Sequence, residues 1–191
     1  MATTQPIRNK HQVRIFAQHY LKLGKIRNHV LVVFGLHTAL RICDLLCLTW
    51  DDVYDFDNRR FRNSISITEN KTRKSKTITL NKRAIAALGV YLSSAERGVF
   101  LFASRKGENA AISRQQAYRI IRAASDALGF ACRVSCHSLR KTFGYHAWKA
   151  DVPPMVIMKV FNHSNLAVTQ RYLGITQDDI DDCYHKIASL M

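Results

Sequence analysis

The sequence contains few acidic residues, few prolines and no long apolar run. Only 14 of its 191 residues are aspartate or glutamate, and only 3 are proline. No apolar stretch reaches the roughly 20 residues that a membrane-spanning helix requires. The N-terminal segment MATTQPIRNKHQ lacks the apolar core of a signal peptide. These absences argue against a membrane protein and predict a cytoplasmic location.

The cysteines follow no disulfide framework. There are 5 of them, an odd number, at positions 43, 47, 132, 136 and 183. We therefore expect reduced thiols. Cys132, Cys136 and His137 could suggest a metal site, but no second ligand pair has the spacing of a zinc finger. The sequence thus predicts no metal and no other cofactor.

Positive charge dominates the composition. The chain has 29 lysines and arginines and a formal net charge of +15. The tail, residues 176–191, is acidic, and this leaves 28 basic and 10 acidic side chains in residues 1–175. Such a surface could serve solubility alone. It is also typical of proteins that neutralise the phosphates of a nucleic acid, which is the partner we expect.

Helical spacing of apolar residues covers most of the chain, with one β-hairpin in the first half. The hairpin is expected where SISIT and KTITL flank a turn rich in lysine and arginine. The expected helices are residues 10–23, 28–40, 41–48, 81–96, 113–128, 138–150, 153–161, 166–172 and 178–190. The predicted fold is mainly α with a small antiparallel β-sheet, in a single domain over residues 1–191. Its body ends near residue 175 and a tail helix follows.

The segment HTALRICDLLCLTW places Arg41 among apolar residues. A buried arginine is costly unless an anion accompanies it. Asp44, three residues later, would share a helical face with Arg41 and could hold its guanidinium. The pair could be purely structural, or Arg41 could bind a phosphate.

The hairpin turn, ENKTRKSKTITL, gathers Lys71, Arg73, Lys74 and Lys76. A solvated charged turn is the ordinary interpretation. The functional interpretation is a basic finger that lies along a nucleic acid. Because lysine can deliver a proton as well as a charge, one of these residues could act as a general acid.

The segment CHSLRKTFGYHAW places His137 and Arg140 in the first turn of a helix. A helix N-terminus attracts anions, so the two side chains could clamp a phosphate there. Gly144, one turn after Arg140, would leave that face open for a backbone to approach. The alternative is a capping histidine with a surface arginine.

The segment FNHSNLAVTQRYLG contains His163 and, nine residues later, Tyr172. Either residue by itself is more often part of a core. Together with two arginines, a second histidine and a hairpin lysine on a basic protein, they fit phosphoryl transfer without a metal ion. Arginines would then neutralise the developing charge and tyrosine would be the nucleophile.

In their order and spacing these four segments resemble the tyrosine recombinase (phage integrase) family. The likeness runs from about residue 26 to residue 175. It implies that the catalytic residues are Arg41, Lys71, His137, Arg140, His163 and Tyr172. Ala39 and Asn162 stand where the family usually has glycine, and we expect only local backbone adjustments there. Only 40 residues precede Arg41, too few for the helical DNA-binding domain of most members. We therefore expect a catalytic domain alone, as in short inversion-switch recombinases.

The resemblance implies a site-specific recombinase or integrase that needs neither metal nor ATP. Tyr172 would attack a DNA phosphodiester and form a 3′-phosphotyrosyl link, Lys71 would protonate the leaving 5′-oxygen, and Asp44 would hold Arg41. The expected DNA contacts are Arg73, Lys74, Lys76 and Lys141.

The expected partner is double-stranded DNA at a specific site, bound by a protein that is a monomer in solution and a tetramer on DNA. The tail places Ile180, Tyr184, Ile187, Leu190 and Met191 along one helical face, which could dock on a neighbouring protomer or on its own domain.

Two other functions use the same residues. A type IB topoisomerase would relax supercoils with similar chemistry and exchange no strands. A DNA-binding regulator or decoy would keep the fold without catalysis, although it would have no reason to retain both Lys71 and Tyr172.

Overall fold

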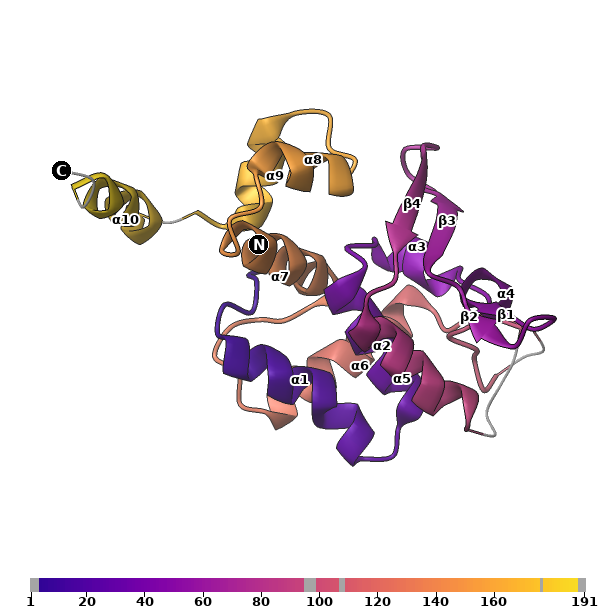
Figure 1. Cartoon of the computed structure of the whole chain (residues 1–191). Helices are drawn as coiled ribbons and strands as arrows, with labels where there is room; N and C mark the ends of the chain where they lie inside the picture. Colours follow the sequence, from indigo (N-terminus) through magenta and orange to yellow (C-terminus); the bar gives the residue numbers. More distant parts are fainter. Residues whose placement is uncertain (1–3, 95–98, 107–108, 176, 189–191) are drawn as a thin grey trace.

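The computed structural model describes residues 4–94, 99–106, 109–175 and 177–188. Helices make up most of this part, with two small antiparallel sheets (Figure 1). The helices are α1 (Lys10–Lys22), α2 (Ile26–His37), α3 (Ile42–Leu46), α4 (Trp50–Val53), α5 (Lys82–Leu92), α6 (Arg114–Ala127), α7 (Cys136–Trp148), α8 (Pro154–Val160), α9 (Leu166–Leu173) and α10 (Gln177–Ala188). The strands are β1 (Tyr54–Asp55), β2 (Arg60–Phe61), β3 (Ser64–Thr68) and β4 (Ser75–Thr79). The predicted fold class, mainly α with a small antiparallel sheet, is confirmed.

Helix α2 forms the centre of the larger core. Its residues from His29 to Leu36 are all buried, as expected of a helix that is covered on every side. Helices α1, α5, α6 and α7 pack around it (Figure 1). Gly35 allows α7 to come close, because a Cβ there would collide with the Leu139 side chain. This contact fixes the position of α7 over the core.

The predicted hairpin is present as strands β3 and β4. Ile65 pairs with Ile78 and Ile67 pairs with Lys76, and the Ile65 and Ile78 side chains are buried. The second sheet, β1 with β2, and the short helix α4 were not predicted. Two-residue strands are too short to show an alternating pattern, so the sequence carries no signal for them.

A smaller core lies under helices α7, α8 and α9. It is built from Ala39, Ile157, Phe161 and Leu173, all essentially inaccessible to solvent. Figure 1 shows α8 and α9 next to α7, on the same side of the molecule as the β3–β4 hairpin. The smaller core therefore places the helix that carries Tyr172 beside α7.

The chain between α2 and α3 differs from the prediction. Helix α2 ends at His37, and Arg41 is not inside a helix but is the N-cap of α3, with an extended backbone (φ −69°, ψ 147°). The break falls at Ala39, which has a left-handed backbone (φ 56°). The apolar residues on both sides of Ala39 are buried by tertiary packing. Their spacing therefore looked helical across residues 38–41, although the helix is interrupted there.

Other helix ends shift by a few residues. Helix α7 begins at Cys136 rather than 138, while Asn81 and Ser113 cap α5 and α6 as predicted. Helix α5 ends at Leu92, and the expected end at Glu96 lies outside the described residues. None of the helices in the described part of the chain is long and apolar enough to cross a membrane.

Candidate active site

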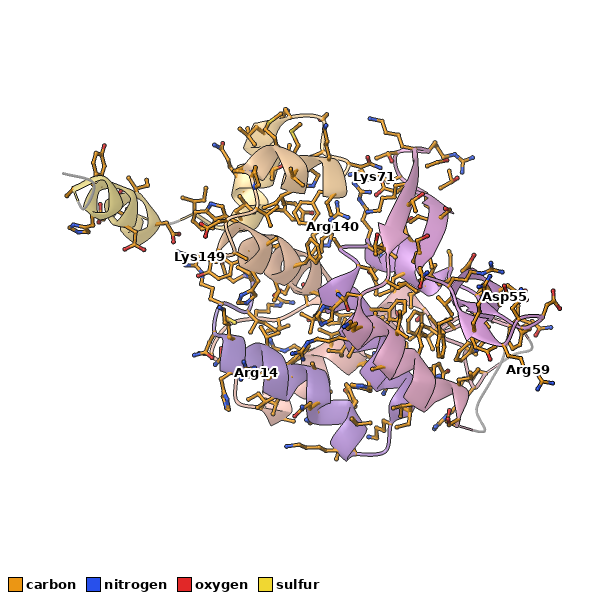
Figure 2. All side chains as sticks on the ribbon, viewed as in Figure 1. Arg14, Asp55, Arg59, Lys71, Arg140 and Lys149 are labelled. Carbon is orange, nitrogen blue, oxygen red and sulfur yellow. The ribbon has the colours of Figure 1, made fainter. Side chains whose placement is uncertain are left out.

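Arg140 lies at the centre of the candidate site. It projects from α7, it is only 1% exposed, and Figure 2 shows it between α7 and the β3–β4 hairpin. Its Nη1 donates to the carbonyl of Ala39, and its Nη2 donates to the carbonyl of Phe161 at 2.6 Å. Its guanidinium carbon lies 4.5 Å from the centre of the Phe161 ring. Burial and the charge of Arg41 lower the pKa of Arg140 to about 10, so it stays charged at neutral pH.

Two left-handed residues direct these carbonyls toward Arg140. Ala39, with φ 56°, supplies one carbonyl itself. Asn162, with φ 52°, shares a peptide unit with the Phe161 carbonyl. A left-handed backbone costs roughly 1–2 kcal/mol for a residue other than glycine, although asparagine tolerates it better than alanine. This conformation explains why glycine suits both positions.

Tyr172, near the end of α9, faces the same group of residues. Its ring centre lies 4.9 Å from that of His163 and 6.0 Å from that of His137. The guanidinium carbon of Arg140 lies 5.9 Å from the Tyr172 ring centre, and Lys141 Nζ lies 5.7 Å from it. The tyrosine is therefore surrounded by two imidazoles and two cations.

Both histidines are neutral at physiological pH. Burial, followed by the charges of Arg140 and Arg41, lowers the pKa of His163 to about 4. The pKa of His137 is also lowered, first by desolvation and then by Arg140 and other cations. His163 Nδ1 lies 3.0 Å from the buried hydroxyl of Thr169, which fixes the orientation of the ring. Each imidazole can therefore accept a proton or donate a hydrogen bond.

Arg41 is held by Glu69, a residue that the sequence analysis did not select. Arg41 Nη1 lies 2.7 Å from Glu69 Oε2, and the Glu69 side chain is fully buried. The Thr72 hydroxyl donates to the same oxygen at 2.6 Å. Burial alone would raise the pKa of the Glu69 carboxyl, but the hydrogen bonds from Thr72 and Arg41 outweigh it and the pKa is lowered. Glu69 is thus a buried carboxylate beside a predicted catalytic arginine.

Asp44 makes a different contact from the one predicted. It is buried, and its Oδ1 accepts a hydrogen bond from the Asn70 backbone N–H at 2.9 Å. The ion pair that the structure shows for Arg41 is with Glu69. Asp44 was expected to share a helical face with Arg41, but Arg41 precedes α3 in an extended conformation. Asp44 therefore fastens the hairpin turn to α3.

Lys76 points inward, which does not fit the prediction that it contacts DNA. Its side chain is 11% exposed and lies with Nζ 3.9 Å from Glu69 Oε1. Its Nζ donates to the carbonyl of Val160, the last residue of α8, at 3.0 Å. Burial, with the charge of Arg140, lowers the pKa of Lys76 to about 8. Lys76 links the hairpin to the chain just before His163.

The remaining hairpin cations face solvent. Lys71, Arg73 and Lys74 are exposed in the turn, and Figure 2 shows Lys71 near the outer end of the hairpin. A cleft of about 1030 Å³ has Arg41, Lys71 and His137 in its walls. The cleft therefore joins three of the predicted catalytic residues from three separate segments of the chain.

Lys141 contacts the N-terminal segment, residues 4–9. Its Nζ donates to the carbonyl of Thr4 at 2.7 Å, which leaves it less free to contact DNA than predicted. The Ile7 side chain is buried, and Arg8 Nη2 donates to the carbonyl of Gly174 at 2.8 Å. The segment thus contacts both α7 and Gly174, the C-cap of α9, the helix that carries Tyr172.

Helix α10 extends away from the rest of the molecule (Figure 1). Tyr184 is 74% exposed and Ile180 is 44% exposed. Asp179 Oδ1 lies 2.6 Å from Lys149 Nζ, at the end of α7. Of the predicted apolar face, the Ile187 side chain and all of Leu190 and Met191 lie outside the described residues. The described part of that face is open to solvent.

Alternation along the hairpin could have revealed Glu69 and Lys76. Side chains on a strand point to opposite faces in turn, so Glu69 falls on the face of Ile65 and Ile67. Lys76 likewise falls on the face of Ile78. These isoleucines indicate which face of the hairpin points inward. Because the turn is rich in basic residues, it was interpreted as exposed, and the two charged residues on the inward face were not recognised.

Cys43, Cys47, Cys132 and Cys136 are free thiols. Burial raises the pKa of the Cys136 thiol to about 11, so it stays protonated. Among the described residues, no three or more histidine, cysteine or acidic side chains lie together in a way that could hold a metal ion.

Comparisons with known proteins point to one family. The sequence model of the phage integrase family matches residues 7–178. The chain is 34% identical over 190 residues to the probable integrase/recombinase YoeC of Bacillus subtilis (strain 168), and the alignment covers 100% of both chains.

Solved structures show the same fold. The crystal structure of XerA recombinase has a TM-score of 0.76 at 20% identity, over 96% of this chain and 66% of that one. The XerH site-specific recombinase, in a post-cleavage complex with a palindromic difH substrate, has a TM-score of 0.76 at 16% identity, over 96% of this chain and 53% of that one. The chain thus spans between half and two thirds of these two proteins. The family match over most of the sequence, with this fold, shows that the chain belongs to the phage integrase family, the tyrosine-type site-specific recombinases.

Proposed function

We propose that this protein cleaves and rejoins DNA through a covalent 3′-phosphotyrosyl link at Tyr172. The observation that carries the proposal is the setting of the tyrosine, whose ring lies 4.9 Å from His163 and 5.9 Å from the guanidinium carbon of Arg140. Double-stranded DNA is the proposed partner, in keeping with the basic body of the chain and with the DNA substrate of XerH.

The first step exchanges one phosphodiester for another. The Tyr172 oxygen attacks the phosphorus, a bond to that oxygen forms, and the bond to the 5′-oxygen breaks. The phenol's proton goes to a neutral imidazole, and His137 and His163 both lie beside the ring. In the second step the 5′-hydroxyl of another strand attacks the phosphotyrosine and gives its proton to the Lys71 amine, while Tyr172 leaves and recovers its proton from the imidazole.

Arg41 and Arg140 stabilise the charge on the phosphate oxygens in the transition state. A planar guanidinium donates two parallel hydrogen bonds to a phosphate, and donors fixed before the reaction need no reorganisation during it. The Ala39 and Phe161 carbonyls fix Arg140, and Glu69 fixes Arg41. Because the bonds exchanged are of one type, the reaction requires no ATP, and the two arginines supply the charge neutralisation that a metal ion would otherwise provide.

Lys71 supplies the proton that the leaving 5′-oxygen takes up. Its place in an exposed turn that lines the cleft leaves its amine free to approach a strand bound there. Lys76 is the other hairpin lysine near the site, but its Nζ is buried against Val160 and faces away from solvent. Lys71 is therefore the better proton donor.

Strand exchange requires more than one copy of the protein, and α10 provides a means of assembly. Its exposed Ile180 and Tyr184 would pack on a neighbouring protomer. The protein would be a monomer in free solution and a tetramer on paired DNA sites. Residues 1–175 would form the catalytic body, with the tail as the link between protomers.

A nicked suicide substrate tests the chemistry. The DNA comes from inverted repeats that flank the gene, and the nick lets the cleaved 5′-end diffuse away. We expect a denaturant-resistant adduct through a 3′-phosphate, formed in EDTA. Tyr172→Phe should abolish the adduct and leave DNA binding intact.

An adduct that persists in Tyr172→Phe would overturn the proposal, as would binding without any adduct from the wild type. A plasmid with two sites separates recombination from relaxation. Resolved or inverted products support the recombinase, whereas relaxation without exchange indicates a topoisomerase.

A further inference from the structure

Glu69 lies behind Arg41 as seen from the cleft. Arg41 forms part of the cleft wall, whereas the Glu69 side chain is fully buried. The carboxylate meets one guanidinium nitrogen, Nη1, at 2.7 Å. Since arginine has five N–H donors in a rigid plane, the other edge of the guanidinium remains available for a phosphate. Glu69 therefore restrains Arg41 without competing for the substrate.

Glu69 is itself held in place. The Thr72 hydroxyl donates to its Oε2 at 2.6 Å. Its backbone closes the hairpin turn, because its N–H donates to the Lys74 carbonyl and its carbonyl accepts from the Arg73 N–H. A carboxylate fixed at both backbone and side chain can determine the orientation of a guanidinium that pairs with it.

The charges around Glu69 explain why an anion is needed there. The charge of Arg41 lowers the pKa of Arg140, and the charge of Arg140 lowers that of Lys76. Burial lowers both pKa values most, and the negative charges of Glu69 and Asp44 act in the opposite direction. Arg41, Arg140 and Lys76 can lie near one another because the buried carboxylates of Glu69 and Asp44 offset part of their repulsion.

We propose that Glu69 is a positioning residue for strand cleavage, whose buried carboxylate holds the Arg41 guanidinium in the orientation that the scissile phosphate meets. The inference rests on the proposed function, in which Arg41 binds that phosphate. Glu69 does not touch the reacting atoms, so its effect must pass through Arg41.

The test compares Glu69→Gln with the wild type on the suicide substrate at saturating DNA. The rate of adduct formation should fall about 10- to 100-fold, because a misplaced guanidinium loses transition-state stabilisation. DNA affinity should change by less than about threefold, since the cations that reach phosphates at the surface are untouched. Asp57→Asn is the matched control, because it makes the same change in charge at an exposed turn and should leave the rate unchanged.

A second substrate separates positioning from a merely structural role. With a neutral methylphosphonate at the scissile position, the reaction has less negative charge for Arg41 to stabilise. The penalty of Glu69→Gln should then shrink several-fold, whereas a defect in folding would reduce both reactions equally. Thr72→Val, which removes only the hydroxyl on Glu69, should give a smaller loss of the same kind and keeps the test valid if Glu69→Gln folds poorly.

The wild-type adduct keeps the two proposals distinguishable. If the wild type forms no adduct at Tyr172, the proposed function fails. If the wild type reacts and Glu69→Gln reacts at the same rate, or loses the same factor on both substrates, the positioning role of Glu69 is wrong and the function stands.

Discussion

Arg140 donates a hydrogen bond to the carbonyl oxygen of Ala39, which lies 101 residues earlier in the chain. The contact joins α7 to the break between α2 and α3. It exists because Ala39 turns its carbonyl toward α7 through a left-handed backbone. The position of a predicted catalytic arginine thus depends on the backbone of a residue that has no reactive side chain.

Substitutions at Ala39 should separate backbone conformation from packing. Ala39→Gly should change the free energy of unfolding by less than about 1 kcal/mol, because relief of the left-handed backbone offsets the loss of a buried methyl group. Ala39→Val should lower it by about 2 kcal/mol or more and slow cleavage, because β-branched residues are strained there. Urea denaturation measures the three proteins, and equal stability of all three would contradict the prediction.

Gly144 should be intolerant of any side chain. A Cβ at this position would lie 2.7 Å from Phe161 Cζ and 2.9 Å from its Cε2. The sequence predicted that the helix face at Gly144 is open to an approaching backbone. In the structure the Phe161 ring, which also stacks on Arg140, fills that space. Gly144→Ala should lower the free energy of unfolding by about 1–3 kcal/mol through overpacking, and it should reduce the rate of adduct formation.

Gly89→Ala is the matched control for that change. Gly89 lies in α5, and the nearest atom to its added Cβ would be Phe61 Cε2 at 4.0 Å. Because alanine favours a helix more than glycine does, Gly89→Ala should raise the free energy of unfolding by roughly 0.5–1 kcal/mol. Equal effects of the two substitutions would show that Phe161 does not limit position 144.

The sequence spacing selected residues that lie close together in the fold, but it did not predict the contacts that hold them there. Four short segments named His137, Arg140, His163 and Tyr172, and the structure brings these four together. The predicted contact of Asp44 assumed that Arg41 lies inside a helix. The predicted contact of Lys76 assumed that its side chain lies on the outer face of the hairpin. Both depend on tertiary packing, at Ala39 and at the hairpin, which local spacing does not record.

Stability should fall as the pH drops from 6.5 toward 4, in part because of His163. Its folded pKa of about 4 lies below the ordinary value of 6.5, so the unfolded chain binds more protons in this window. The contribution of His163 should be about 1–2 kcal/mol after allowance for solvent screening. Denaturant titrations of His163→Gln should show a shallower loss over the same window. An unchanged slope would mean that the imidazole is not desolvated in the folded protein.

The hairpin lysines should contribute unequally to DNA binding. Lys74 is exposed, so Lys74→Ala should weaken binding to any sequence and reduce the log–log salt slope by about 0.9 if it meets one phosphate. Lys76→Met should leave that slope unchanged, because its amine is buried against Val160. Fluorescence anisotropy over a range of salt concentrations measures both. A flatter slope for Lys76→Met than for Lys74→Ala would place Lys76 on the DNA instead.

Removal of the tail should separate assembly from folding. An ion pair of Asp179 with Lys149 joins the tail to its own body. The Lys149 side chain is 34% exposed and that of Asp179 is 7% exposed, and a pair still open to solvent on its lysine side contributes only about 1 kcal/mol. Deletion of residues 177–191 should therefore leave the melting temperature and single-site DNA binding nearly unchanged. Higher-order complexes on paired sites, and recombination between them, should be lost.

Tyr184→Ser in the full chain keeps the helix and the ion pair but removes the most exposed aromatic ring, so it should weaken assembly without altering the melting curve. Native gels with one-site and two-site DNA, together with thermal melting of the free protein, measure these effects. If the deletion unfolds the free protein, the tail belongs to its own core and does not link protomers.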